Sequence, residues 1–246
     1  MPLDVANASS GLRTAFAVFP LMLLGIIVLL QFWAARRLGE SSATVTRRTL
    51  IVAGACALWL AATGALAASG RLARFDLRPP PFMAFVVVIV LTAILAARSE
   101  WGDYLIEGLP LWALIGIQGF RWPLELLMHR AAAERVMPPQ MTYTGWNFDI
   151  LTGVTAAVLG LVLMRRDLPI AFLRVWNVTG ALLLTNIIAV AVVSTPMFGW
   201  FGRDALNTWV AHPPFVWLAA VMVPVAIAGH LLIARRLSRE RRIAAR

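Results

Sequence analysis

The chain has 246 residues, of which 60% are hydrophobic and 14% are charged, and its mean hydropathy is +0.78. Soluble domains are about 45–50% apolar, so this composition excludes an ordinary soluble domain and is typical of a protein that lies in lipid. The net charge of +10 does not indicate nucleic-acid binding, because the arginines stand at the ends of apolar runs, where membrane topology accounts for them.

Residue usage also limits cofactor chemistry. All 22 basic residues are arginine, which excludes retinal or another carbonyl cofactor held as a lysine Schiff base. The single cysteine, Cys56, excludes intrachain disulfides and CxxCH haem attachment. Only Arg13 precedes the first apolar run and no clear A-x-A site follows, so we expect this run to remain in the mature protein. We expect no cofactor.

Apolar runs of membrane-spanning length recur along the chain and predict an all-α bundle that forms one transmembrane domain over residues 1–246. Breakers or charges separate the runs, as in Arg36–Gly39 and Arg78–Pro81. We expect seven spans: Thr14–Ala35, Leu50–Ser69, Pro80–Ala97, Gly108–Arg130, Phe148–Met164, Leu173–Thr195 and Pro214–Ala234.

Arginine is distributed unequally between the two sides of such a bundle. The richer side has Arg36, Arg37, Arg47, Arg48, Arg98, Arg165, Arg166, Arg174, Arg235, Arg236, Arg239, Arg241, Arg242 and Arg246. The other side has Arg13, Arg71, Arg74, Arg78, Arg130, Arg135 and Arg203. The positive-inside rule then places the N-terminus outside and the C-terminus in the cytoplasm, and the arginine-only usage favours a bacterial inner membrane.

An odd number of spans is required, because the first loop and the tail share the arginine-rich side. Seven satisfies this condition and six does not. The third run is short and the fourth is charged. Five spans are therefore the main structural alternative.

The fourth run carries a polar stripe of candidate functional residues. Gln118, Arg121, Glu125 and His129 fall within an arc of about 80° on a helix. Glu125 is four residues from both Arg121 and His129, so its carboxylate is placed to pair with either. A bare charge in a membrane costs a few kcal/mol, so we expect the stripe to face the bundle interior. A purely structural ion pair is the alternative to a functional site.

The next segment continues this pattern with Gln140, Tyr143, Asn147 and Asp149, which we expect near the outer end of the stripe. Asp149 heads a helix face with small residues, Gly153, Ala156 and Gly160, which permit close helix packing. A helix N-cap is the alternative role for Asn147 or Asp149.

Later runs add fewer candidates. Asn186 lies nearer mid-membrane than Asn177 and is the better candidate for the same cavity, although an interhelical hydrogen bond explains such an asparagine equally well. Pro224 predicts a kink. We expect His230 near the cytoplasmic surface, beside Arg235.

The histidines raise the question of a metal or haem site. A site from His129, His212 and either Asp149 or Glu125 is geometrically conceivable, but no HxxxH or HExxH spacing arranges two ligands in advance. We therefore predict no metal.

Two runs of sequence, Phe120–Leu126 and Gln140–Gly153, carry a resemblance to a known family. Together with Trp176-Asn177, Asn186–Ile188, Ser194–Pro196 and Val223–His230, they resemble a family of uncharacterised bacterial integral membrane proteins. The resemblance covers about residues 120–234 and implies no activity.

Three functions remain open on the sequence alone. The first is a binding or transport protein whose ligand, a lipid or a small anion, meets Arg121 and the neighbouring polar residues. The second is a membrane enzyme that acts on a lipid or isoprenoid, with Glu125, Asp149 or His129 in acid–base roles. The third is a structural or assembly partner whose polar stripe only holds the bundle together.

Overall fold

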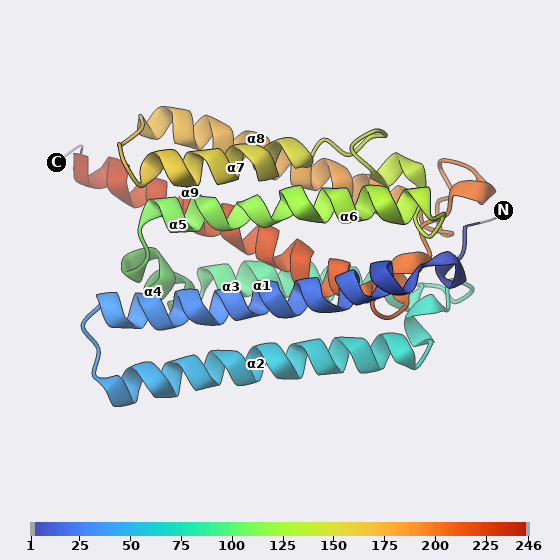
Figure 1. The fold of residues 1–246 in the computed structure, drawn as a ribbon, viewed down its shortest axis with the longest axis horizontal. Coiled ribbons are helices and arrows are strands. Elements are labelled where there is room, and N and C mark those ends of the chain that lie inside the picture. The colour runs from blue at the N-terminus through green and yellow to red at the C-terminus, as the bar shows by residue number, and fades with distance from the viewer. Residues whose placement is uncertain (1–2, 245–246) are drawn as a thin grey trace.

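The structure is a computed structural model that describes residues 3–244, with side chains up to Glu240. All regular elements in this range are helical and none is a strand, so the prediction of an all-α bundle is confirmed. The helices run roughly parallel to one long axis, and the two termini lie at opposite ends of the bundle (Figure 1). The α-helices are α1 (Ser10–Arg37), α2 (Ser42–Ala68), α3 (Pro81–Arg98), α4 (Glu100–Gly108), α5 (Leu111–Gly116), α6 (Arg121–Ala133), α7 (Ile150–Leu163), α8 (Ile170–Val193) and α9 (Val223–Ala244).

Shorter helical elements connect these helices. The 3-10 turns among the described residues are η1 (Val5–Asn7), η2 (Arg71–Ala73), η3 (Ile117–Phe120), η4 (Pro139–Met141), η5 (Arg203–Ala205) and η6 (Trp209–Ala211). A π-helical turn, η7 (Leu218–Met222), leads directly into α9. Likewise η3 joins α5 to α6 without a break, so residues 111–133 form one rod.

Five of these elements are long and apolar enough to cross a membrane, namely α1, α2, α3, α8 and the segment Leu218–Glu240. The helix α7 is apolar but shorter, and the rod 111–133 is divided by η3. The structure is thus that of a membrane protein with several apolar helices. The number seven and the orientation remain predictions.

Local sequence explains where the helices begin and end. Ser9 caps α1 by accepting a hydrogen bond from Leu12 N at 3.2 Å, and Ser41 does the same for α2. After α1, Gly39 adopts a φ of +73°, which glycine tolerates best. This turn confirms the predicted break after the first run.

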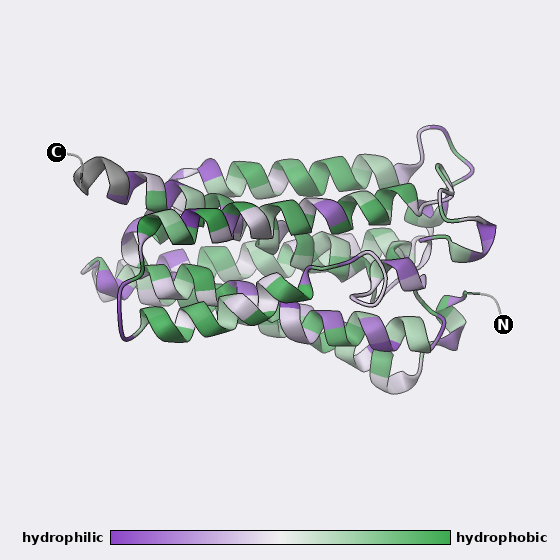
Figure 2. Ribbon diagram, turned by 90° about the horizontal axis from the view of Figure 1, so that it is seen from above, coloured by the Kyte–Doolittle hydropathy of each residue, from purple (hydrophilic) through white to green (hydrophobic). Residues whose placement is uncertain are grey.

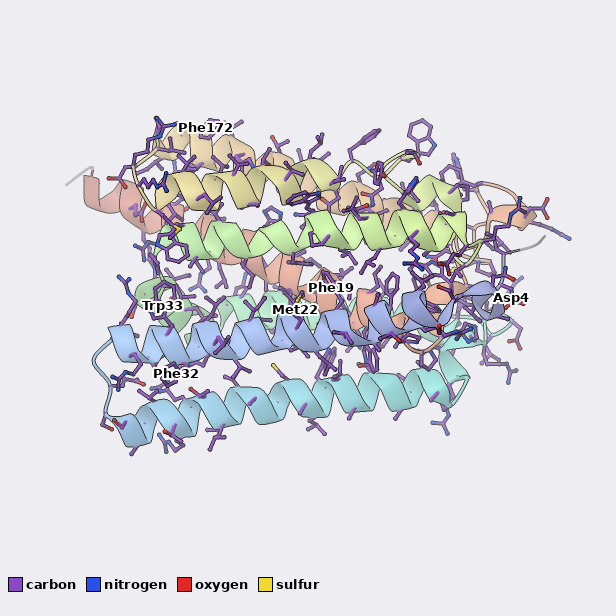
Figure 3. The ribbon with its side chains drawn as sticks, in the orientation of Figure 1. Asp4, Phe19, Met22, Phe32, Trp33 and Phe172 are labelled. Atoms are coloured by element: carbon purple, nitrogen blue, oxygen red, sulfur yellow. The ribbon has the colours of Figure 1, made fainter. Side chains whose placement is uncertain are left out.

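Hydrophobic residues make up most of the length of the helices (Figure 2). Leu58 and Leu95 are 72% and 68% exposed, and many other large hydrophobic side chains are exposed with them, which is typical of a surface that lipid covers. In Figure 3 the neighbouring side chains Phe32 and Trp33 lie on opposite sides of α1. Phe32 is exposed, whereas Trp33 packs on Trp112 with 5.3 Å between ring centroids. Apolar side chains therefore face both inward and outward, as in a membrane bundle.

The arginine-rich loops gather at one end of the bundle. The α1–α2 loop, the α7–α8 loop and the C-terminal part of α9 share the end opposite the N-terminus (Figure 1). This agrees with the predicted grouping, although Arg241, Arg242 and Arg246 of the tail lie outside the described side chains. We call it the arginine-rich end.

The helix α4 at this end was not predicted. Its carboxylates pair with α9: Asp103 accepts from Arg235 Nη2 at 2.7 Å and also from Arg239, and Glu107 accepts from Arg239 Nη1 at 3.0 Å. Charged residues between two apolar runs are typical of a loop, but here they form a short amphipathic helix whose carboxylates bind the arginines of α9.

The α4 ion pairs generate a prediction of pH dependence. The hydrogen bond from Arg235, with the charges of Arg235 and Arg239, holds the pKa of Asp103 below its ordinary value of 3.8. A carboxyl with a depressed folded-state pKa stabilises the fold above its unfolded pKa, and this contribution is lost as the pH falls through the folded pKa. We therefore expect the thermal midpoint of the wild type to exceed that of Asp103→Asn at neutral pH, and the difference to shrink below about pH 4.

Thermal unfolding in detergent between neutral and acidic pH measures this effect. Asp167→Asn, at an exposed position of the same end, is the control. A difference between wild type and Asp103→Asn that is constant down to the lowest pH would contradict the prediction.

The small face of α7 packs closely on another helix, as the sequence predicted, and its partner is the rod 111–133. A Cβ on Gly153 would overlap Trp122 N, and one on Gly160 would lie 2.9 Å from Gly116 Cα. Ala156, between them, is fully buried. The backbones of α7 and the rod therefore approach as closely as only small residues permit.

This packing predicts a large effect of a single methyl group. We expect Gly153→Ala to lower the free energy of unfolding by at least 1–3 kcal/mol, about the cost of overpacking, because backbone atoms cannot move aside. Gly25→Ala on α1, where nothing lies within 4 Å, is the control, and we expect it to be neutral or stabilising. Equal midpoints for the two variants in detergent unfolding would show that α7 is not packed in this way.

Candidate functional site

The rod 111–133 brings the predicted polar stripe into the bundle. Its backbone stays in the right-handed helical region through the 3-10 turn, with φ and ψ of −61° and −30° at Ile117 and −65° and −31° at Arg121. Gln118, Arg121 and Glu125 are at most 2% exposed, and His129 is half-buried. A 3-10 stretch in the middle of a helix often accompanies a functional site.

The helix α7 is too short to cross the roughly 30 Å core of a bilayer on its own. It has 14 residues and is about 21 Å long, whereas α8 has 24 residues and is about 36 Å long. In Figure 1, α7 begins midway along the bundle, and an irregular chain connects it to α6. The residue at this internal helix start is Asp149.

An ion pair joins the rod to the start of α7. Arg121 Nε and Nη2 donate to the two carboxylate oxygens of Asp149. The side chains of Arg121 and Asp149 are 1% and 6% exposed. Two parallel hydrogen bonds between a guanidinium and a carboxylate are the strongest arrangement for such a pair. The charge of Arg121 is therefore neutralised inside the bundle.

His230 of α9 completes the surroundings of Arg121. Its Nε2 lies 2.7 Å from Arg121 Nη1, and its Nδ1 lies 2.9 Å from Asn177 Oδ1. Because the guanidinium can only donate, Nε2 accepts, and the ring proton is on Nδ1, directed to Asn177. Asn177 Nδ2 donates in turn to the backbone oxygen of His230 at 3.1 Å. Four helical elements thus meet at one guanidinium.

These contacts correct several sequence predictions. The ion-pair partner of Arg121 is Asp149 and not Glu125. Asp149 occupies the N-cap position of α7 without making a side-chain cap bond, because its oxygens face Arg121. His230 is 4% exposed because its ring lies between Arg121 and Asn177, so it has the bundle-interior position and not the interfacial one that the sequence favoured.

Asn147 holds the second carboxylate, Glu125. Its Nδ2 lies 2.8 and 2.7 Å from the two Glu125 oxygens and 3.0 Å from Met141 O. Its Oδ1 accepts from Asp149 N at 3.0 Å. One amide therefore links Glu125, the irregular segment and the start of α7, which is more than the cap role considered from the sequence.

The other predicted residues of this region hold the irregular segment in place. Gln140 Nε2 donates to Ser194 Oγ and Ala205 O at 3.0 and 2.8 Å. Asn186 Nδ2 donates to Trp146 O at 2.6 Å, and the rings of His129 and Tyr143 stack 4.7 Å apart. In the interior, Asn177 and not Asn186 reaches the polar cluster, contrary to the prediction. Asn186 was preferred for its predicted depth in the membrane, but the two asparagines lie on different faces of α8, and the face decides which one reaches the cluster.

Gln118 is buried in a different environment. It is fully buried, and neither atom of its amide has a hydrogen-bond partner among the described residues. A Cβ on Gly229 would overlap Gln118 Nε2, so the amide lies against the backbone just before His230. Gln118 thus sits beside the Arg121 cluster without bonding to it.

A cavity of about 90 Å³ adjoins the cluster. Its polar lining residues are Arg121, Glu125, Asp149 and Asn207, and its remaining wall is apolar. Asn207 Oδ1 has no hydrogen-bond partner in the described part of the chain. Of the predicted site residues, Arg121, Glu125 and Asp149 line this space, and Gln118, His129, Gln140, Tyr143, Asn147 and Asn186 do not.

The cavity opens sideways. Its fully buried lining residues include those of the rod and of the loops beyond α6 and α8. Its partly exposed lining residues lie on α3, α8 and the η7–α9 rod, and include Val86, Val90, Ile187, Ile188 and Val223. The π-helical turn η7, a feature common at functional sites, contributes Leu218, Ala219 and Met222. The mouth therefore faces the apolar flank of the bundle.

Metal coordination has no cluster to support it. No group of three or more His, Cys, Asp and Glu side chains that could hold a metal occurs within residues 3–240. The conceivable set of His129, His212 and a carboxylate is therefore not assembled. Of the other histidine contacts, His129 stacks on Tyr143 and His230 contacts Arg121.

The apolar helices and the buried ion pair define the class as a multi-pass membrane protein. No family model, curated protein or solved structure matches the chain.

The ion-pair geometry generates a double-mutant prediction. We expect Arg121→Gln to destabilise the bundle by about 3–5 kcal/mol, because it leaves Asp149 buried without its partner. Arg121→Gln with Asp149→Asn recovers part of this loss, and Arg121→Gln with Glu125→Gln recovers less. Unfolding titrations in mixed micelles give both coupling energies. A larger coupling to Glu125 would contradict the pairing described above.

Proposed function

We propose that seven helical rods cross a bacterial cytoplasmic membrane, with the N-terminus outside. The rod 111–133 is about 35 Å long, enough for a bilayer core. The short α7 is completed by the irregular segment 134–149, in which Gln140, Met141, Asn147 and Asp149 are buried and hydrogen-bonded, whereas Trp146 and Phe148 are exposed. Non-helical backbone at membrane depth is tolerated where protein groups satisfy it in this way. The arginine-rich end supports a cytoplasmic C-terminus.

Within this bundle we propose a binding site for a lipid-soluble molecule that carries a hydrogen-bond donor. One observation supports it above the others: the cavity joins Glu125 to a mouth on the lipid-facing flank. A cavity needs about 10–15 Å³ to hold one water, so about 90 Å³ accepts a small polar group and a short alkyl segment, with the rest extending through the mouth.

The charges around the cavity favour a ligand with a hydrogen-bond donor over an anionic ligand. A guanidinium has five N–H donors, and three of those of Arg121 already face Asp149 and His230. Glu125, by contrast, has only the Asn147 amide and free lone pairs. Because Asp149 balances Arg121, an ionised Glu125 would leave the cluster at −1. A hydroxyl or ammonium group therefore suits this wall better than the small anion considered from the sequence.

The enzyme alternative depends on the same residue. Asp149 is committed to Arg121, and His129 does not line the cavity, so Glu125 is the one acid–base group on the cavity wall among the described residues. Transport of the same ligand is a further alternative. The resemblance to a family of bacterial membrane proteins remains a prediction and adds no activity.

Matched ten-carbon probes test the binding site. We expect decylamine and decan-1-ol to raise the thermal midpoint of the purified protein and decanoate to leave it unchanged. Glu125→Gln abolishes the decylamine shift, because the ammonium loses its counter-charge, while the variant still folds. The exposed, distant Glu100→Gln retains the shift.

A second pair of variants tests the mouth. Ala191 lines it and Ala189 faces away on the same helix, so Ala191→Phe blocks all probe shifts and Ala189→Phe does not. Preferential binding of decanoate, or equal shifts in the two phenylalanine variants, would refute the proposed site.

A further inference from the structure

A second hollow lies on the other side of α3. It is a groove of about 660 Å³ between α2, η2 and α3, within the range of roughly 300–1,000 Å³ typical of small-molecule sites. Its lining from α3 is Pro81, Ala84, Phe85 and Val88, whereas the cavity beside Glu125 uses Phe82, Val86, Ile89 and Val90. The two spaces are therefore separate, and the groove does not depend on the proposed function.

Two tryptophans explain why the groove is open. Trp59 Nε1 donates to Ala220 O at 2.7 Å, and Trp217 Nε1 donates to Leu60 O at 3.1 Å. These bonds fasten α2 to the π-helical turn η7, and α2 packs along α1 on its other side. The face of α2 toward α3 is left uncovered, which agrees with the peripheral position of α2 in Figure 1.

The groove is apolar along its length and cationic at one end. Trp59, Leu66, Leu72 and Phe85 form much of its wall. The polar groups other than Thr63 are Arg71 and Arg74, which lie in the α2–α3 connection. Thr63 Oγ1 already donates to backbone oxygens of α2. The shape and charge are those of a receptor for a chain with an anionic head.

Arg71 is the arginine available to a ligand. Arg74 donates to both oxygens of Asp76, at 2.8 and 2.7 Å. The guanidinium of Arg71 is exposed and has no hydrogen-bond or ion-pair partner among the described residues. With Arg78 included, three arginines face one aspartate in this connection, so the local charge is 3 − 1 = +2.

We propose that this groove holds an acyl chain of an anionic phospholipid, with the phosphate on Arg71. Cationic side chains at the membrane surface attract anionic headgroups by about 1 kcal/mol each, and the apolar groove receives the chain. A second copy of this protein suits the groove less well, since its net charge of +10 repels the cationic end of the groove.

Native mass spectrometry from nanodiscs with defined lipids tests the headgroup. We expect phosphatidylglycerol to be retained more than phosphatidylcholine with the same chains, and Arg71→Gln to lower its retention about fivefold. Arg203→Gln, an exposed arginine at the same end but outside the groove, leaves retention unchanged. Inorganic phosphate does not compete, because it lacks the chain.

Filling the groove tests the chain. Ala62 lines it and Ala61 does not, although both are exposed on α2, so Ala62→Trp reduces retention of both lipids and Ala61→Trp does not. Equal phosphatidylglycerol retention in Arg71→Gln and Arg203→Gln would overturn the proposal. So would a lipid-free dimer that Ala62→Trp converts to a monomer, since the groove would then be an interface between copies.

Discussion

The neutralisation of Arg121 is the constraint on which the interior of this bundle depends. A guanidinium in an apolar interior requires a partner with good geometry, and Asp149 supplies it with both oxygens. To do so, Asp149 must stand at the depth of Arg121, which fixes where α7 begins. His230 of α9 contacts the remaining side of Arg121, and Asn177 of α8 holds His230 from behind, so both helices are positioned around the same charge.

A helix that begins inside the bundle creates a second requirement. The chain before it, residues 134–149, is helical only at the short 3-10 turn η4, so its other buried backbone groups need partners elsewhere. Asn147 and Asn186 supply two of them, with bonds to Met141 O and Trp146 O, and Gln140 ties the segment to η5 by its bond to Ala205 O. Much of the polarity that looked like a ligand site is therefore structural. What remains for a ligand is the wall formed by Glu125 and its neighbours.

The sequence predicted the helices and the polar stripe, because hydropathy and a 100° period are local properties. It placed Arg121, Glu125 and Asp149 in one region, and they line one cavity. It did not predict which carboxylate pairs with Arg121, since an i,i+4 neighbour and a residue 28 positions away are indistinguishable without tertiary geometry. The seventh span was predicted to end too early because the last turns of α9 are charged, and His230 was therefore expected too close to a helix end. The helix α4 was not predicted because charged residues between two apolar runs are typical of a loop.

Because the mouth of the cavity faces the lipid, the ligand concentration that determines occupancy is the concentration in the bilayer. Under the proposed function, a ligand that arrives through the apolar flank lined by α3 and α8 is drawn from the bilayer and not from water. Each added methylene favours transfer into lipid by about 0.8 kcal/mol, or roughly fourfold. Occupancy measured against total ligand would therefore rise with chain length even where the extra carbons touch no protein atom. The membrane itself acts as a concentrating step, and selectivity is left to the few polar atoms around Glu125.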